Sequence, residues 1–449
     1  MSLRPGIDIQ TTVKTSLLQE NSSGSAFIIA TANWGTENTL QSYEGASAIT
    51  SLYKSGALPI SANMYVAGKG RTINIYRFVP DDATTSNLTL AGAVGDGIDL
   101  TAKYKGSYGN NIWVKVEAVD SNRKITISDD KNIEIYDNGG EGYSSNDDIT
   151  SIINEQSKFV AAETSTSSLV AVASKSLLTG GDNGTAITTS DVQTIIDEKF
   201  DLSYDVLLVP ELTDDTTHNT IGNLMETRET ENKEYSIFIS GIDKDEAYAT
   251  TIARTATTSQ GRLIRLAPGT FEYDDTKYSG GYGACYYAGL YLSQEIAESP
   301  THKPFGLTKY INGSNETVNY NNTQVNNLIA LGFTVINKVG NYQAPIRAVT
   351  SINDLSSPFF EQSIRRSIDT IKSNLITNLN PFIGQKNTNF KRVQMKGVID
   401  SYLNRSVSDT ILNSYESEVL DTDVPTEVAV NLILSPVYPI NDISINLTI

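Results

Sequence analysis

The sequence is poor in the residues that hold small domains together through covalent bonds or metals. Its single cysteine, Cys285, excludes a disulfide within the chain. Its two histidines, His218 and His302, lie far apart and make a poor start for a metal site. We therefore expect neither a disulfide-stapled secreted domain nor a histidine-rich metalloprotein.

Basic residues are scarce relative to acidic ones. The chain has 34 lysines and arginines against 52 aspartates and glutamates, which gives a formal net charge of −18. Most of such a surface repels nucleic acid and anionic lipid. This charge balance argues against a nucleic-acid-binding protein.

Long hydrophobic runs are absent as well. The apolar run from Ala26 to Ala30 spans five residues, whereas a helix that crosses a membrane needs about 18. The start, Met1 to Gly6, is not followed by the apolar segment that a signal peptide contains. The sequence therefore predicts no membrane insertion. It indicates a chain that is made and kept in a cytoplasm, or released by a route other than signal-peptide secretion.

The composition is that of a globular protein, with 39% hydrophobic and 19% charged residues. At about 150 residues per domain, the length predicts roughly three domains. Strand patterns at 205–210, 235–239 and 261–266 alternate with helical patterns, including one at 243–257. This alternation favours a parallel or mixed sheet with helices on its faces.

The pattern between about 95 and 184 is different. Short β segments such as Ile98 to Ala102 and Ile112 to Val116 flank a turn rich in glycine and asparagine, and helical signals are sparse. We interpret this stretch as an inserted β-rich module. The predicted fold class is thus mixed α/β and multidomain. The predicted segments are 1–25 (N-terminal strand and linker), 26–94 and 185–355 (α/β core), 95–184 (insert), and 356–449 (C-terminal helices and strands).

A basic island stands out near the C-terminus. Residues 361–405 carry a net charge of +5 within an otherwise acidic chain. A helix at 358–379 shows an unbroken apolar stripe, and a second helix is predicted at 389–402. The island indicates a dedicated contact, and a solvated helix face is the alternative interpretation. Its candidate contact residues are Arg365, Arg366, Lys372, Lys386, Lys391, Arg392 and Lys396.

Both ends of the chain have the pattern of strands without a domain of their own. Ile7, Asp8 and Ile9 alternate in polarity, and so do the residues from Ile443 to Ile449. A polar linker, Gln10 to Ser25, separates the first strand from the core. A tethered strand of this kind suits donation to the sheet of a neighbouring chain, although pairing within its own chain is also open. The candidate inter-subunit residues are Ile7, Asp8, Ile9, Ile443, Ile445, Leu447 and Ile449.

No catalytic constellation is apparent. The segment Gly45 to Ile49 lacks the last glycine of a nucleophile elbow. Gly68-Lys69-Gly70 lacks the glycine spacing and the hydroxyl residue of a phosphate-binding loop. Cys285 falls inside a predicted helix and is better interpreted as an inert buried thiol. We therefore expect no catalytic, cofactor-binding or metal site, and no enzyme.

Taken in order, several segments resemble the tail sheath proteins of contractile phage tails and phage-tail-like bacteriocins. The segments that carry the resemblance are Arg4-Pro5-Gly6-Ile7-Asp8-Ile9, Asn33-Trp34-Gly35, Ile73 to Phe78, Ala102 to Ile112 (AKYKGSYGNNI), Leu178 to Gly184 (LTGGDNG), Phe382 to Thr388 with Arg392, and Leu434 to Ile443. Ala102 to Ile112 is the most specific of them. The first segment departs from the family pattern, with Asp8 where an aromatic residue is common.

The resemblance implies a structural subunit that assembles into stacked six-membered rings around a tail tube. It implies that strands at the two termini link neighbouring subunits, that the basic island faces the tube, and that contraction needs no cofactor. The implied partners are further copies of the chain, the tail tube protein, the baseplate and the tail terminator. The implied location is a virion tail or phage-tail-like particle assembled in a bacterial cytoplasm. The alternatives are another self-assembling shell or surface-layer subunit and, with less support, an α/β hydrolase.

Overall fold

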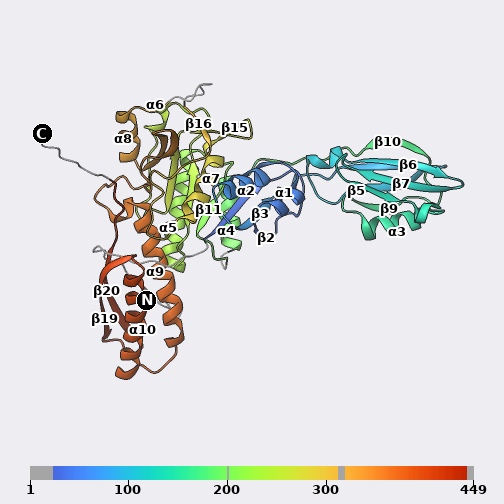
Figure 1. Cartoon of the computed structure of the whole chain (residues 1–449). Coiled ribbons are helices and arrows are strands. Elements are labelled where there is room, and N and C mark those ends of the chain that lie inside the picture. The colour runs from blue at the N-terminus through green and yellow to red at the C-terminus, as the bar shows by residue number, and fades with distance from the viewer. Residues whose placement is uncertain (1–23, 200–201, 312–318, 442–449) are drawn as a thin grey trace. The chain divides into compact units, whose positions relative to one another are not determined.

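The computed structural model describes residues 24–199, 202–311 and 319–441 (Figure 1). These residues form two compact units. One unit comprises the described parts of 1–27, 64–73 and 189–449, and the other comprises 28–63 and 74–188. Within the described ranges, no helix is long and apolar enough to span a membrane.

The second unit contains a small α/β part and the β-rich module. In the α/β part, β3 (Thr72–Phe78) lies between β1 (Ser25–Thr31) and β2 (Leu40–Glu44), with helices α1 (Ser47–Tyr53) and α2 (Ala57–Ala67). The interior residues of β1 and β3 are buried, as their near-continuous apolar runs predict.

The β-rich module is built from two antiparallel sheets, and its first strand begins at Asn87, ahead of the predicted start at 95. One sheet has the order β4-β5-β9 and the other β10-β6-β7-β8. The strands are β4 (Asn87–Ala91), β5 (Asp96–Ala102), β6 (Trp113–Val119), β7 (Asn122–Ser128), β8 (Ile133–Tyr136), β9 (Val160–Thr164) and β10 (Ala173–Leu177). Helix α3 (Asn146–Gln156) and the 3-10 turns η1 (Ser107–Asn111) and η2 (Asn138–Gly140) complete the module. Its apolar core includes Ile98, Val114 and Ile125.

The turn between β5 and β6 is fixed by a buried arginine at the end of β3. Arg77 donates to the carbonyls of Ala32 at 2.9 Å, Gly35 at 2.6 Å and Lys105 at 2.6 Å. Gly106 follows with a φ of +124°, and a Cβ there would lie 2.4 Å from the Asn33 carbonyl oxygen. The close approach requires glycine, because any side chain would collide with backbone.

The first unit is built on a mixed sheet, as predicted. The order of its strands is β18-β17-β13-β12-β11, parallel except for antiparallel β18. These strands are β11 (Val206–Leu208), β12 (Ile237–Gly241), β13 (Leu263–Ala267), β17 (Phe333–Val339) and β18 (Tyr342–Pro345). The helices of this part are α4 (Thr189–Glu198), α5 (Asp215–Asn232), α6 (Tyr248–Thr251), α7 (Gly280–Ser293) and α8 (Asn322–Ala330). A small antiparallel sheet consists of β14 (Thr270–Tyr273), β15 (Thr276–Ser279) and β16 (Thr308–Tyr310).

The predicted helix at 243–257 is wrong, because only Tyr248–Thr251 is helical. Asp245 has a φ of +61°, which no α-helix accommodates. Arg254 donates to Glu246 at 2.9 Å and to Asp243 at 2.9 Å, so these carboxylates hold a folded loop in place of helical turns.

The C-terminal part follows the predicted order with shifted bounds. Pro358–Phe360 forms a separate 3-10 turn (η3), and extended Glu361 separates it from α9 (Gln362–Leu379). The predicted stripe of Ile364, Ile368, Ile371, Leu375 and Leu379 is buried. After the turn η4 (Asn380–Phe382), helix α10 (Asn389–Ser408) extends beyond the predicted end at 402. The hairpin β19 (Leu412–Asp421) and β20 (Val428–Pro436) follows.

Candidate assembly surfaces

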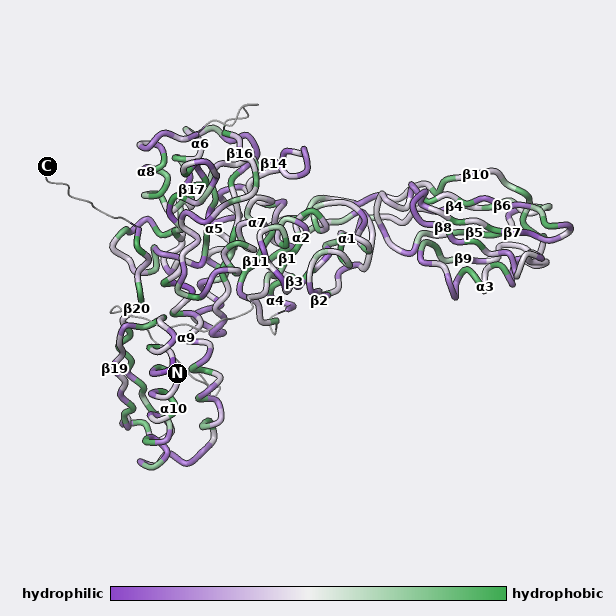
Figure 2. Tube along the Cα trace, in the orientation of Figure 1, coloured by the Kyte–Doolittle hydropathy of each residue, from purple (hydrophilic) through white to green (hydrophobic). Residues whose placement is uncertain are grey.

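The β19–β20 hairpin is a two-stranded sheet that packs one face on the C-terminal helices. Val430, Leu432 and Leu434 of β20 lie at every second position and join the apolar cluster of α9 and α10. Figure 2 shows hydrophobic and hydrophilic residues interleaved along these strands. In the part of the chain that the structure describes, no third strand pairs with either one. Both outer edges therefore present backbone hydrogen-bonding groups that could pair with a further strand.

The opposite face of the hairpin is exposed and carries both acidic and apolar residues. Glu416 lies opposite Ile433, and Leu420 lies opposite Ala429. Ile433 is 39% exposed and Leu420 37%. Exposed apolar side chains beside open strand edges are typical of a surface that other chains cover.

Polar contacts fix the hairpin to α10. Lys396 donates to Asp400 Oδ2 and to Ser417 Oγ, each at 2.8 Å, and Ser417 donates to Asp400. The Tyr415 hydroxyl donates to the Asp400 carbonyl at 3.2 Å. Partial burial would raise the pKa of Asp400, but the hydrogen bonds from Lys396 and Ser417 outweigh it and lower that pKa. Lys396 thus has an intramolecular role at the base of the hairpin.

The structure corrects the assignment of three basic residues to a contact surface. Arg365, Arg366 and Lys372 lie 0%, 7% and 8% exposed. The helical pattern places them away from the centre of the apolar stripe, but a second layer of protein covers this flank of α9. Their charged groups are therefore not available to a partner.

Arg365 and Lys372 belong to a buried ionic cluster, which we define as Glu229, Arg262, Arg365, Asp369 and Lys372. Glu229 on α5 accepts from Arg262 at 2.7 Å, and from Arg365 and Lys372 at 2.8 Å each. Asp369 accepts from Arg262 at 2.6 Å and also from Arg365. Burial opposes the charge of Glu229, but the three cations outweigh it and hold the pKa of that carboxyl far below its usual range. The cluster ties α9 to α5 and β13.

Arg366 has a different role, at the end of α7. Its guanidinium donates to the carbonyls of Tyr291 and Gln294 at 2.9 Å each, and of Leu292 at 3.3 Å. Carbonyls at the C-terminal end of a helix lack the N–H of a following turn, and that of Tyr291 accepts only a long bond from the Gln294 amide at 3.4 Å. Arg366 therefore caps α7 and joins it to α9.

The remaining island residues lie on and before α10. Arg392 pairs with Asp421 at 3.2 Å and donates to Asn387 at 2.6 Å. Lys386 is exposed and Lys391 is half-buried, and they lie close in sequence to two strongly exposed apolar side chains, Phe390 (67%) and Val393 (63%). The sequence analysis did not single out Phe390 and Val393. Apolar residues that lie off the buried face of a helix were the signal that could have identified them. We call Lys386, Phe390, Lys391 and Val393 the tip patch.

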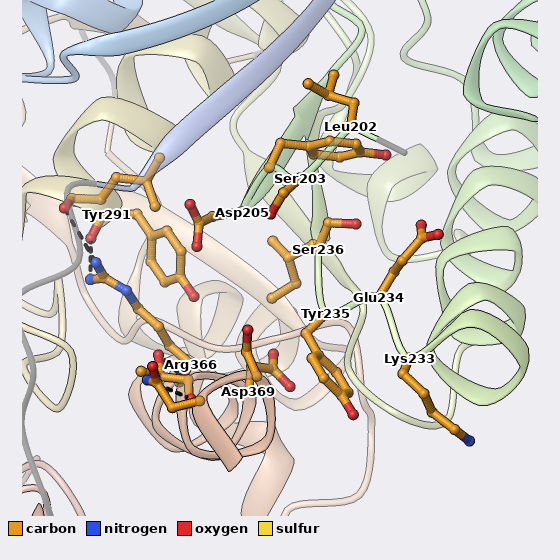
Figure 3. A pocket seen from close by; sticks show the side chains of 16 residues that line it. Leu202, Ser203, Asp205, Lys233, Glu234, Tyr235, Ser236, Tyr291, Arg366 and Asp369 are labelled. Atoms are coloured by element: carbon orange, nitrogen blue, oxygen red, sulfur yellow. Dashed lines mark hydrogen bonds between the residues drawn. The ribbon is translucent and has the colours of Figure 1, made fainter. Parts of the chain in front are cut away.

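A polar pocket lies between α9, the start of β11 and the start of β12. Its volume is about 360 Å³, and Figure 3 shows Asp205, Tyr291, Arg366 and Asp369 around it. No histidine or cysteine lines it. Within the described ranges, no group of three or more histidine, cysteine, aspartate or glutamate side chains is arranged to hold a metal ion.

The residues with catalytic side chains that the sequence singles out lie apart from this pocket. Cys285 is buried inside α7, where its thiol contacts the Gly281 carbonyl at 3.5 Å. His218 is fully buried on α5 beside Phe238. Burial, with the nearby charges of Arg254 and Arg265, lowers the pKa of His218 to about 3. His218 therefore stays neutral over the physiological range.

The seven residues of the two terminal strands, Ile7, Asp8, Ile9, Ile443, Ile445, Leu447 and Ile449, lie outside the described residues. Their assignment to inter-subunit contacts stays a prediction. The described residues nearest to these strands are Gly24 and Asn441.

Solved structures match the chain over nearly its whole length. The sheath tail protein of Desulfitobacterium hafniense is 13% identical with a TM-score of 0.68, and the match covers 96% of this chain and 100% of that one. The sheath tail protein of Listeria innocua is 16% identical with a TM-score of 0.66, and covers 93% of each chain. The contracted helical sheath of the anti-feeding prophage is 13% identical with a TM-score of 0.56, covering 100% and 99%. No protein-family model and no curated protein sequence matches. The chain therefore has the fold of sheath tail proteins.

We predict that Glu229→Gln strongly destabilises the chain, because it leaves three buried cations with one carboxylate. Breaking a buried charge pair costs about 3–5 kcal/mol of unfolding free energy. The measurement is urea denaturation followed by circular dichroism. Glu231→Gln, at an exposed position of the same helix, is the matched control and should change stability by less than about 0.5 kcal/mol. Equal stability of the two variants would contradict the role of the cluster.

We predict that His218 makes stability fall in acid. Its pKa is lowered to about 3 in the folded chain, so between its ordinary value and 3 only the unfolded chain binds the proton. The contribution of His218 to the free energy of unfolding is therefore fully present above about pH 6.5. Below that pH it decreases by about 1.4 kcal/mol per pH unit. Denaturation between pH 7 and pH 4 should show a smaller pH slope for His218→Gln than for the unmodified chain. Identical slopes would refute this assignment.

Proposed function

We propose that this chain is the structural subunit of a contractile tail sheath, which polymerises around a tail tube and contracts to drive the tube through a bacterial envelope. The observation that carries the proposal is the fold, which matches sheath tail proteins along 93–96% of this chain. A neighbour of the same fold is a helical sheath in its contracted state. The order of sequence motifs supports the same function independently.

The proposed link between subunits is strand addition to the β19–β20 hairpin. The hairpin offers two open edges, and its inner face already packs on α10. The segments with Ile7 to Ile9 and Ile443 to Ile449 have the period-two pattern of strands that need a sheet. Strands donated by neighbours would complete a larger sheet through backbone hydrogen bonds. Pairing of this head-to-tail kind does not close on itself, so it propagates as a helix. We propose that the helix consists of stacked six-membered rings.

The proposed contact with the tube is the tip patch. Lys386 and Lys391 supply positive charge, while Phe390 and Val393 supply exposed apolar surface. Arg392 and Lys396 lie on the same helix and contribute charge there, although each also pairs within the chain. An exposed ion pair is worth about 0–1 kcal/mol, so several together can hold the tube and still release it.

The proposed movement is rigid-body rearrangement of subunits from an extended to a contracted array. Each compact unit has buried apolar residues of its own, which suits movement without unfolding. We infer no catalytic step and no cofactor. Baseplate and tail terminator are further proposed partners, and a matching fold occurs in a structure of the anti-feeding prophage baseplate. We propose assembly in a bacterial cytoplasm and residence in a virion tail or phage-tail-like particle.

We predict that Lys386→Glu with Lys391→Glu abolishes sheathing of tubes, because the proposed contact relies on the positive charge of these two lysines. Electron microscopy of the chain mixed with tubes gives the sheathed fraction, which should fall at least tenfold. The control is Lys244→Glu with Lys338→Glu, which changes net charge equally at exposed sites away from the tip patch. Normal sheaths from the tip variant would refute the tube contact.

We predict that deletion of residues 1–9 leaves a folded subunit that cannot polymerise. The deletion removes a proposed donor strand, and the described core of the subunit begins only at residue 24. Its melting temperature should stay within about 2 °C of that of the full chain, while cylinders disappear from electron micrographs. Long sheaths from the shortened chain would refute strand donation.

A further inference from the structure

The first described residues are held at one carboxylate. The Ser25 amide donates to Asp205 Oδ2 at 2.8 Å, and the Asp205 amide donates to the Ser25 carbonyl at 2.9 Å. Gly24 packs against the end of α7, since a Cβ at Gly24 would lie 2.6 Å from Leu292 Cδ2. We call Gly24, Ser25 and their contacts the N-terminal root. The direction in which the chain enters the subunit is thereby fixed.

The last described residue is held at a second carboxylate. Asn441 Nδ2 donates to Glu361 Oε1 at 3.0 Å. The same oxygen accepts from Arg347 Nε at 2.8 Å, and Glu361 is buried. Glu361 Oε2 and Asn441 Oδ1 are themselves buried and without a hydrogen-bond partner in the subunit. We call Asn441 and its contacts the C-terminal root.

Both roots are connected to the N-terminal end of α9. Glu361 directly precedes α9, and Arg366 lies in its second turn. Arg366 donates to the Leu292 carbonyl, and Leu292 is the side chain against which Gly24 packs. Figure 3 shows Arg366 beside Tyr291, with Asp205 across the same pocket. Five residues of helix span about 7.5 Å, so a short rigid segment separates the two roots.

We propose that Glu361 to Arg366 is a mechanical junction that joins the two terminal arms, so that tension on one arm reaches the other through the start of α9. The inference rests on the proposed function, because it requires the arms to link neighbouring subunits. A helix held by buried side chains transmits displacement, whereas a flexible loop absorbs it. The ionic cluster holds the following turn of α9 through Arg365 and Asp369, so the junction has a fixed base. Asn441, Glu361 and Arg366 are positioning residues in this scheme.

The test uses full-length chain assembled on tubes, with Asn441→Ala to release the C-terminal root and Arg366→Lys to loosen the N-terminal root. Asn326→Ala, at an exposed position of α8, is the matched control. Electron microscopy over time in mild urea gives the rate of contraction. Each root variant should assemble sheaths of normal length and contract about tenfold faster, the change expected for one lost hydrogen bond to a charged group. The control should contract at the unmodified rate.

The double variant tests whether the roots act through one path. If both roots act through the junction, either variant alone already removes the coupling between the arms. The double variant should then contract at a rate within about twofold of the faster single variant. Rates that multiply, or an unmodified rate for Asn441→Ala, overturn the junction while leaving the proposed function intact. Failure of the unmodified chain to form sheaths overturns the proposed function and the junction together. Calorimetry of the isolated chains should show that Asn441→Ala unfolds at the same temperature as the unmodified chain, and a lost unfolding transition would overturn the role of Asn441 as a positioning residue.

Discussion

The attraction between Glu229 and the cations around it is the interaction on which the C-terminal half of the structure depends. Through Arg262, Arg365 and Lys372 it joins three elements that are far apart in sequence, namely α5, β13 and α9. Helix α9 in turn packs on α10, and α10 supports the β19–β20 hairpin. The position of the hairpin and of α10 therefore depends on a cluster that is buried inside the subunit.

The same cluster explains why charge patterning alone wrongly assigned Arg365 and Lys372 to a contact surface. The sequence predicts α9, its apolar stripe and its cations, because these depend on spacing within one helix. It does not predict burial of Arg365, since the compensating Glu229 lies 136 positions earlier on another helix. Lys386 belongs to the same basic island as Lys372 and is exposed. A cation on a helix flank thus remains ambiguous until the covering layer is known.

The fold class and most core strands could be predicted, because they depend on residue patterns within a single short segment. β1, β12 and β13 are short apolar runs whose burial follows from composition, and β20 has apolar residues at every second position from Val428 to Leu434. The short strands β14 to β16 and helix α8 carry no strong period, so their structure depends on contacts made elsewhere. The expected helix at 243–257 failed because Arg254 offered its neighbouring carboxylates a better partner than helical turns do.

The buried ionic cluster fixes the relative position of two helices more strictly than an apolar contact does. Such a contact suits a subunit that moves as a rigid body. Replacing a buried ion network with well-packed apolar residues is often neutral or stabilising, so stability alone does not account for the cluster. Apolar surfaces tolerate small slides, because their attraction has no direction. The cluster tolerates none, since any slide of α9 along α5 leaves Arg365 or Lys372 buried without Glu229. The cluster therefore fixes one register between the helix that supports the hairpin and the core that must turn with it.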